Sequence, residues 1–446
     1  MPTRPNFDDT TALFEGQSRM VGVGRIVSNG RSCATCHRPD LRDGNGQIVA
    51  QLRLGLPSRF PLTDTIPLGD DLFTGRVADD GDHPDGFANL NERGLVLIRP
   101  GRFNPIIADS DPFRQIIVWR KVPHFVNTGL TLGFVLDGRM RDIQETTRGA
   151  IFSHTQNFDQ RFDDLLQAPN PRFPSGPPAF EERSRNISAF LETTTIDPPA
   201  LKAFLNPSDP TLNPACSNAP GAPCTPRDCQ RLTGSPSCDL YTVLVTDPFF
   251  TVPIQTAAQA RGKKVFARNC MGCHNTPNVF GNIEHVPGQL LAFPPRTGHT
   301  FDIGVSQRNT FALDFRAFVC TEPPPAPDEP CANKSLQSVV LPLAQADGGL
   351  VEHEVTDDTG TAVGTGRFED LHRFKVPQLR RIGQLGPYFH DNSAATLEQV
   401  LDYFESSWYR RSSDGRDFPI RLAPRERPDL LEFLRGLSRL VGIGMP

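Results

Sequence analysis

The chain has 446 residues, a formal net charge of −5 at pH 7, 43 prolines and 37 glycines. This charge argues against nucleic acid or an anionic membrane surface as a partner, and the sequence has no run of about 18 apolar residues to span a bilayer. The length allows two or three domains, and the proline and glycine content favours irregular structure around short helices.

The first predicted element is an amphipathic helix at residues 10–27, which leads into the run Cys33-Ala34-Thr35-Cys36-His37. A Cys-x-x-Cys-His run is the attachment signature of c-type haem. Its two cysteines form thioethers to the porphyrin, and the histidine that follows lies under the iron as the proximal ligand. The sequence therefore predicts one haem at Cys33, Cys36 and His37. The residues after this motif predict loops as far as residue 112.

A second run of this kind, Cys270-Met271-Gly272-Cys273-His274, follows a predicted helix at residues 256–266. It predicts a second haem at Cys270, Cys273 and His274. Neither run has the second ligand pair of a zinc site, and a redox Cys-x-x-Cys needs no following histidine. Residues 300–370 predict another loop region, Thr396 opens a predicted helix, and the last helix is expected near residues 429–441.

Six cysteines lie outside the two haem motifs: Cys216, Cys224, Cys229, Cys238, Cys320 and Cys331. Their even number permits three disulfides, and the short proline-rich loop between the last two favours that pair. The other four lie in residues 197–247, which are predicted to form a disulfide-stapled insertion. Disulfides and covalent haem together imply a periplasmic or otherwise exported protein. The first residues contain no apolar signal-peptide core, so we expect that a signal peptide has been removed.

Two further pairs of sequence blocks are informative when they are taken together with the haem motifs. The first pair is Trp119-Arg120-Lys121-Val122-Pro123-His124-Phe125-Val126-Asn127 and Phe134-Val135-Leu136-Asp137-Gly138-Arg139. The second is Phe374-Lys375-Val376-Pro377-Gln378-Leu379-Arg380 and Gly386-Pro387-Tyr388-Phe389-His390-Asp391-Asn392-Ser393. In this order, the blocks resemble the bacterial dihaem cytochrome c peroxidase and MauG family. The resemblance spans residues 33 to 405.

The resemblance implies a division of labour between the haems. The N-terminal haem would react with peroxide, and the C-terminal haem would receive electrons or stabilise high-valent charge. Arg139 would fix the Asp137-Gly138-Arg139 turn by a salt bridge or by contact with a haem propionate. His390 would be one of the residues that bind the second haem.

Three positions near the first haem bear on its chemistry when the family pattern is carried over. The distal glutamate aligns with Gln156, which can donate a hydrogen bond but cannot shuttle a proton between the peroxide oxygens. His154 could supply the missing acid–base group, bind the iron or contact a propionate. The removable distal histidine aligns with Phe113, which cannot ligate iron. The first haem is therefore expected to be five-coordinate without an activation step, unless His83 or another residue of the loop before Arg120 reaches the iron.

The surroundings of the second haem depart from the family pattern as well. The tryptophan that the family places between the haems aligns with Leu136, so a radical relay is poorly provided for. The sixth-ligand position aligns with Phe404, and other candidates for this ligand are Tyr403, Tyr409, His285 and His299. The asparagine that helps to hold an interhaem calcium aligns with Lys121. Its ammonium could occupy the place of the cation, so a bridging calcium is not expected.

The sequence thus predicts a mainly α-helical fold with extensive irregular loops, in which two cytochrome c-like haem domains pack together. The predicted boundaries are 1–196 for the N-terminal haem domain, 197–247 for the insertion and 248–446 for the C-terminal haem domain. The predicted function is peroxide-dependent oxidation at the first of two haem c groups, with a small redox protein as electron partner. A pure electron carrier and a dioxygen-using haem oxygenase related to rubber oxygenases are the alternatives. The oligomeric state does not follow from the sequence.

Overall fold

The computed structural model describes the C-terminal half of the chain most fully. The described residues are 89, 93, 95–98, 115–116, 118–121, 123, 135–136, 138, 143–148, 181, 184–185, 187–188, 254–270, 272–274, 300–320, 334–379 and 382–437. The chain divides into two compact units, each made of discontinuous segments. Unit 1 comprises Met1–Val126, Asp142–Glu192 and Asn309–Leu371, and unit 2 comprises Asn127–Arg141, Thr193–Arg308 and His372–Pro446. The predicted boundaries at 196 and 247 stay a prediction.

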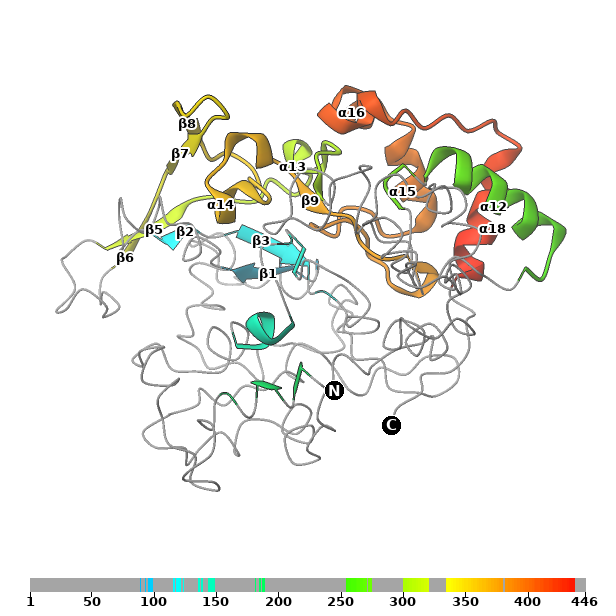
Figure 1. The fold of residues 1–446 in the computed structure, drawn as a ribbon, viewed down its shortest axis with the longest axis horizontal. Helices are drawn as coiled ribbons and strands as arrows, with labels where there is room; N and C mark the ends of the chain where they lie inside the picture. The colour runs from blue at the N-terminus through cyan, green and yellow to red at the C-terminus, as the bar shows by residue number, and fades with distance from the viewer. Residues whose placement is uncertain are drawn as a thin grey trace, which may run out of the picture. The chain divides into compact units, whose positions relative to one another are not determined.

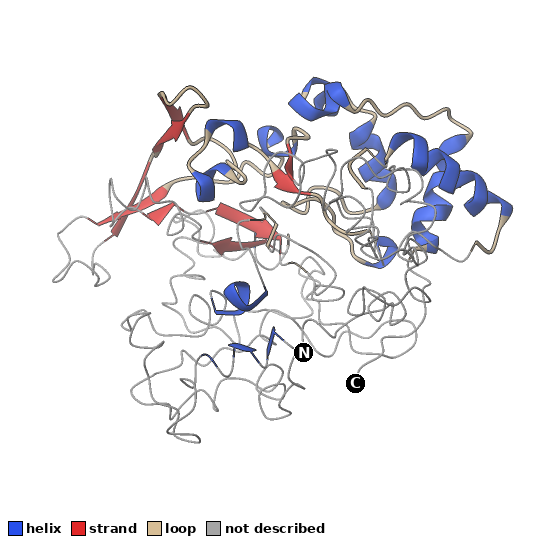
Figure 2. Ribbon diagram, in the orientation of Figure 1, coloured by secondary structure: helices blue, strands red, loops and turns tan. Residues whose placement is uncertain are grey.

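Unit 1 contains three small antiparallel sheets among its described residues. Strand β1 (Leu95–Ile98) pairs with β3 (Val118–Lys121), with Leu97 opposite Trp119. Strand β5 (Ala317–Cys320) lies between β2 (Gln115–Ile116) and β6 (Lys334–Gln337). Strands β7 (Val340–Ala344) and β8 (Leu350–Glu354) form a hairpin, drawn as neighbouring arrows in Figure 2.

The prediction of irregular structure over residues 300–370 is wrong for this part of the chain, because four of these strands lie in it. In β7, Leu341 and Leu343 are fully buried while Val340 is exposed, which is the period-two pattern of a strand with one covered face. The turn that follows uses Gly348 at φ 86°, a left-handed conformation that glycine adopts without steric cost. Alternation followed by a glycine turn is the local signal that identifies this hairpin.

The core of unit 1 joins these strands to the short helix α14 (Ala362–Thr365). Its buried members are Leu95, Val118, Trp119, Leu313, Phe315, Val339, Leu341, Leu343, Val355, Ala362 and Val363. Beside this core, the Arg120 guanidinium forms an ion pair with Asp358, and the two side chains are only 3% and 2% exposed. The Asp358 carboxylate also accepts a hydrogen bond from the Gly360 amide at 2.9 Å. A buried charge pair therefore connects strand β3 to the loop before α14.

Unit 2 is helical over most of its described length. Its helices are α12 (Ala257–Asn269), α13 (Val305–Arg308), α15 (Leu397–Phe404), α16 (Ser407–Arg411), α17 (Ser413–Asp417) and α18 (Glu426–Gly436). A short pair of strands, β4 (Thr300–Phe301) and β9 (Phe374–Lys375), and two single-turn 3₁₀ helices, η5 (Phe368–Asp370) in unit 1 and η6 (Ile382–Gln384) in unit 2, complete the elements. No helix among the described residues is long and apolar enough to cross a membrane.

A threonine side chain caps the N-terminus of each of the helices α12 and α15. The Thr256 hydroxyl accepts a hydrogen bond from the Gln259 amide at the start of α12. Thr396 opens α15 with a full capping box, in which Gln399 reciprocates toward the cap backbone. The prediction of a helix that opens at Thr396 is confirmed. The last described helix, α18, begins three residues before the predicted position and ends at Gly436.

Helices α12 and α18 pack against each other at close range, the first green and the second red in Figure 1. The contact centres on Gly262, where a Cβ atom would lie only 2.0 Å from the Asp429 carbonyl oxygen. One turn further along, the rings of Phe266 and Phe433 meet with centroids 5.4 Å apart. Glycine is therefore what allows the two backbones to touch, and this contact fixes the helix that ends in the second cysteine motif.

Candidate haem site of unit 2

The second Cys-x-x-Cys-His run begins where helix α12 ends. The Cys270 amide still donates to the Phe266 carbonyl at 2.7 Å, as the last bond of the helix. The Cys273 and His274 amides then both donate to the Cys270 carbonyl, at 3.1 and 2.8 Å. The motif is therefore wound into one further turn, which brings the two cysteines and the histidine close to one another.

The two thiols of this motif, Cys270 and Cys273, are free and half-buried. Burial raises the pKa of both to about 12, and the negative charge of Asp414 adds to this effect at Cys273. Redox-active Cys-x-x-Cys pairs have the opposite property, a depressed thiol pKa. Two neutral thiols followed by an imidazole are the donor set that covalent haem needs, so the residues present fit c-type haem and argue against a redox disulfide.

Aromatic side chains form one wall beside the motif. The rings of Phe389, Tyr403, Phe404 and Tyr409 meet edge to face, with centroids 5.0 to 6.1 Å apart. Phe418 lies so close to Gly272 that a Cβ atom there would be 2.8 Å from its ring. A contiguous apolar wall of this kind excludes water from a bound cofactor and keeps the local dielectric low.

Tyr403 and Tyr409 direct their hydroxyl groups to backbone carbonyls. The Tyr403 hydroxyl donates to the Ile303 carbonyl and the Tyr409 hydroxyl to the Phe418 carbonyl, both at 2.6 Å. Burial raises the pKa of each phenol, so both tyrosines are neutral near pH 7. The Arg308 guanidinium lies over the Tyr403 ring, 5.1 Å from its centroid. Each phenol thus has a structural role, which it would lose on binding iron.

His390 is buried and stacks on Phe374, with ring centroids 3.8 Å apart and planes 10° from parallel. The next residue, Asp391, accepts a hydrogen bond from the Ser393 amide at 3.0 Å. Burial raises the pKa of this carboxyl group, while the Ser393 bonds and the charge of Arg308 oppose the rise. Residues 386–393, one of the blocks that resemble the peroxidase family, therefore form a tight turn. The stacking on Phe374 holds the His390 imidazole in one orientation.

A polar network that the sequence does not reveal lies beside the motif. The Asp414 carboxylate accepts a hydrogen bond from the Asp302 amide at 2.7 Å and forms an ion pair with Arg373 at 3.1 Å. Arg373 also donates to the Thr300 carbonyl at 2.9 Å, and the Ser413 hydroxyl donates to Asp302 at 3.2 Å. The network ties strand β4 to helix α17. Because its members come from three segments that are tens to more than a hundred residues apart, no local sequence pattern indicates it.

Most of the predicted site residues near the first haem lie outside the described residues. They are Cys33, Cys36, His37, Phe113, Arg139, His154 and Gln156. Leu136, the position aligned with the interhaem tryptophan of the family, is described. It is half-buried, and its carbonyl accepts a hydrogen bond from the Lys375 amide at 2.9 Å. Burial lowers the pKa of Lys121, the residue aligned with the calcium ligand, to about 8. The predictions for the first haem and for calcium stay predictions.

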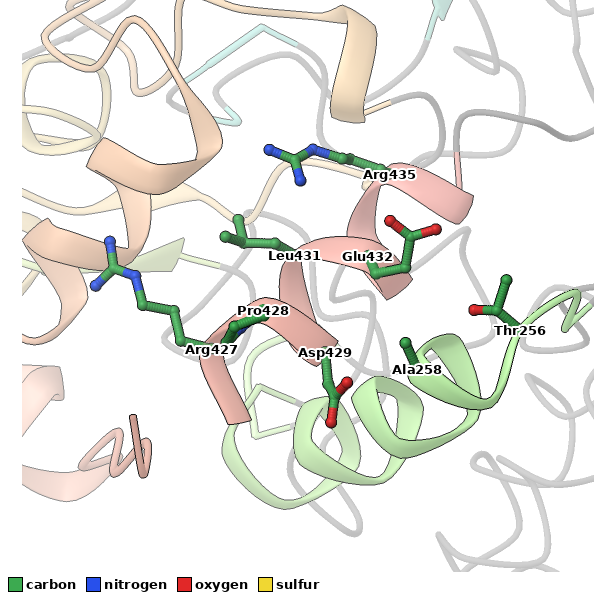
Figure 3. A pocket seen from close by; sticks show the side chains of 8 residues that line it. All are labelled: Thr256, Ala258, Arg427, Pro428, Asp429, Leu431, Glu432 and Arg435. Atoms are coloured by element: carbon green, nitrogen blue, oxygen red, sulfur yellow. The ribbon is translucent and has the colours of Figure 1, made fainter. Parts of the chain in front are cut away.

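An open pocket lies between the start of α12 and helix α18, and Figure 3 shows its lining side chains. They are Thr256, Ala258, Arg427, Pro428, Asp429, Leu431, Glu432 and Arg435. Its arginines are engaged: Arg427 pairs with Asp402 and Glu405, and Arg435 pairs with Glu398. None of the lining residues belongs to the cysteine motif, so this pocket is not the candidate haem site.

Removing the two thiols of unit 2 tests the site directly. The Cys270→Ala/Cys273→Ala variant is expected to lose one of the two predicted covalent haems, because alanine cannot form the thioether bonds. Intact-protein mass and the pyridine haemochrome spectrum measure this loss. The matched variant, Cys33→Ala/Cys36→Ala, should lose the other haem. A variant that kept both covalent haems would contradict the assignment.

Comparison with known proteins gives partial matches. No protein-family model matches the chain. The chain is similar to the methylamine utilization protein MauG of Methylorubrum extorquens, 34% identical over 93 residues, which are 19% of this chain and 26% of that protein. It is also similar to the cytochrome-c peroxidase IdrP1 of Pseudomonas sp. strain SCT, 29% identical over 82 residues, which are 18% of this chain and 22% of that protein.

Two further matches are shorter in sequence or lower in similarity. The cytochrome c551 peroxidase of Nitrosomonas europaea is 55% identical over 38 residues, 8% of this chain and 11% of that protein. A MauG-like protein associated with microbial copper homeostasis has a crystal structure that aligns over 72% of this chain and 73% of that chain, with 17% identity and a TM-score of 0.34. The sequence matches span about a quarter or less of the curated relatives. In these segments the chain is a distant, partial homologue of MauG and of the dihaem cytochrome c peroxidases.

Proposed function

We propose that this chain is an exported dihaem oxidoreductase that reduces hydrogen peroxide to water at the haem held by Cys33, Cys36 and His37. The two electrons would come from a small redox protein through the haem held by Cys270, Cys273 and His274. The balance is one peroxide, two electrons and two protons to two molecules of water. The observation that carries the proposal is the second motif, where free, half-buried thiols follow the end of a helix beside an aromatic wall.

The partial homology supports peroxide as the oxidant, because two of the relatives are named cytochrome peroxidases. Bound haem would supply the redox-active iron at both sites. The chain's own residues would attach the group through Cys270 and Cys273, ligate it through His274 and exclude water with the aromatic wall. At the first site, Gln156 would donate a hydrogen bond to peroxide, and His154 is the nearest residue in sequence that could carry a proton.

The proposal is tested by mixing the purified holo-protein with hydrogen peroxide in a stopped-flow spectrometer, in the fully oxidised and in the half-reduced form. We expect a rapid change of the Soret band already in the oxidised form, because Phe113 cannot block the first iron. A response only after half-reduction would still be peroxidase activity but would contradict the open first site. The absence of a response in both forms would refute the proposal.

A pure electron carrier is the second candidate, and a specific observation favours it. Glutamine at position 156 cannot titrate, so the acid–base help that peroxide cleavage uses, about 10²–10⁴-fold, would be missing unless His154 provides it. The Gln156→Glu variant separates the two candidates. In a pure electron carrier both irons are six-coordinate, so the variant would stay inert to peroxide and both haems would give low-spin spectra. In a peroxidase the variant would react with peroxide.

A further inference from the structure

The chain segment that covers the second cysteine motif carries an unusual set of charges. Residues 407–425, called here the 407–425 segment, contain five arginines and two aspartates, whereas the whole chain has a net charge of −5. The five arginines are all exposed: Arg410, Arg411, Arg416, Arg421 and Arg425. None of them forms an ion pair with another residue in the described part of the chain.

The arginines of helices α12 and α18 are different in this respect. On α12 and α18, Arg261 pairs with Asp429 at 2.7 Å and Arg268 pairs with Glu426 at 2.8 Å. Arg427 and Arg435 also have carboxylate partners. Of the two aspartates in the 407–425 segment, Asp414 is already neutralised by Arg373. Five arginines against two aspartates leave this segment with a formal charge of +3, and Glu426 offsets part of it at Arg425.

The segment also exposes a large aromatic side chain. Trp408 is 42% exposed, and the Arg411 guanidinium lies 5.5 Å from its ring centroid. Tryptophan and arginine are the residues most enriched among those that dominate binding energy at protein interfaces. A tryptophan held in place by a stacked arginine is thus a preorganised anchor within a positively charged segment.

The segment lies directly on the candidate haem site. Tyr409, next to Trp408, belongs to the aromatic wall and donates to the Phe418 carbonyl. Phe418 packs on Gly272 inside the motif, and the Arg421 amide donates to Asn269 at 3.0 Å, one residue before Cys270. The segment therefore touches the cysteine motif through Phe418, and a protein that docked on the segment would lie close to the motif.

We propose that the 407–425 segment is the docking surface for an acidic electron-carrier protein, which delivers electrons one at a time to the haem of unit 2. The electron-delivery role rests on the proposed function. The binding of an acidic protein to this segment does not depend on it. Complementary charge raises association rates by about 10–10³-fold, with a strong dependence on ionic strength. An acidic protein is favoured over a membrane for two reasons. Asp414 and Asp417 lie among the arginines and would repel an anionic lipid surface, and Trp408 is next in sequence to Tyr409 of the aromatic wall.

Binding is measured by titration calorimetry with oxidised flavodoxin, a small acidic electron carrier, so that no electron transfer is needed. The holo-protein should bind at an ionic strength of about 0.01 M and lose the interaction at about 1 M, where the screening length falls to about 3 Å. The Arg410→Gln/Arg411→Gln variant should weaken binding at least about tenfold. Trp408→Ala should weaken it as well, without any change of charge.

The matched control removes the same charge from helix α12 of the same unit. The Arg261→Gln/Lys264→Gln variant acts on exposed residues of α12 and should change the dissociation constant by less than about threefold. Equal losses in both double variants would mean unspecific attraction and would overturn the proposal. Unchanged binding in the Arg410→Gln/Arg411→Gln variant would overturn it too. So would binding to phosphatidylglycerol vesicles that depends on these arginines while flavodoxin does not bind.

The outcome is independent of the peroxide experiment. A protein that binds flavodoxin through the 407–425 segment but is inert to peroxide would refute the proposed peroxidase function and leave the docking surface in place. A protein that reacts with peroxide but binds flavodoxin no better than the arginine variant does would refute the docking surface alone.

Discussion

Exchanging Arg120 for methionine is expected to destabilise unit 1 by about 3–5 kcal/mol, because the exchange leaves the Asp358 carboxylate buried without its cation. Asp358 is 2% exposed, and it also accepts a hydrogen bond from the Gly360 amide at 2.9 Å, a donor without a full charge. Methionine fills a similar volume, so the loss measures the charge rather than a cavity. The shift of the urea midpoint, followed by far-ultraviolet circular dichroism of the holo-protein, gives the effect.

Two further variants identify the cause of this loss. In the double variant Arg120→Met/Asp358→Leu both charges are gone, so much of the lost stability should return. The exposed pair of Arg316 and Asp314 provides the matched control in the same unit. Arg316→Met should change the stability by about 1 kcal/mol or less, because water already screens that pair. If the double variant were as unstable as Arg120→Met, packing and not the buried charge would be responsible.

The elements that the sequence predicts correctly in unit 2 are those with local signals. Thr256 and Thr396 stand before apolar-periodic segments and cap α12 and α15 through their own hydroxyl groups. The Cys270–His274 run is also local, because five consecutive residues carry all of its protein chemistry. Such features depend on neighbours within four residues, so the order of residues along the chain is enough to find them.

The features that escape sequence reasoning depend on contacts between distant segments. Asp358 lies more than two hundred residues after Arg120, and a single aspartate in a loop carries no sign that it will be buried beside an arginine. Asp414 and Asp302 are 112 residues apart and meet only because strand β4 and helix α17 are brought together. The hairpin of β7 and β8 is a different case, since its alternation and glycine turn were visible in the sequence.

The same distinction applies to the candidate docking surface. The five arginines can be counted in the sequence, but there a charged stretch is most simply a solvated face. The structure favours a docking surface instead, because the 407–425 segment covers the cysteine motif. Phe418 packs on Gly272, and the Arg421 amide donates to Asn269. Charge composition suggests the sign of a partner, and only tertiary placement connects that partner to the haem site.

The second large effect is expected at Gly262, where alanine should destabilise unit 2 although it is the better helix former. Alanine normally stabilises a helix interior by about 1 kcal/mol relative to glycine. Here its Cβ atom would lie 2.0 Å from the Asp429 carbonyl oxygen and 2.8 Å from the Phe433 Cβ. The nearest obstacle is backbone, which cannot rotate away as a side chain does, so α12 and α18 must separate.

We expect a net loss of about 1–3 kcal/mol for Gly262→Ala and a larger loss for Gly262→Val, measured as the shift of the urea midpoint. The matched control is Gly436→Ala at the other end of the same helix pair. There the added Cβ meets only the Gln259 side-chain amide at 3.0 Å, which can move aside, so the stability should change by about 1 kcal/mol or less. Because α12 ends in Cys270, Gly262→Val should also lower the yield of covalent haem at the second motif while leaving the first unchanged. Equal effects of alanine at both glycines would mean that helix propensity, and not the close approach of α12 and α18, decides the outcome.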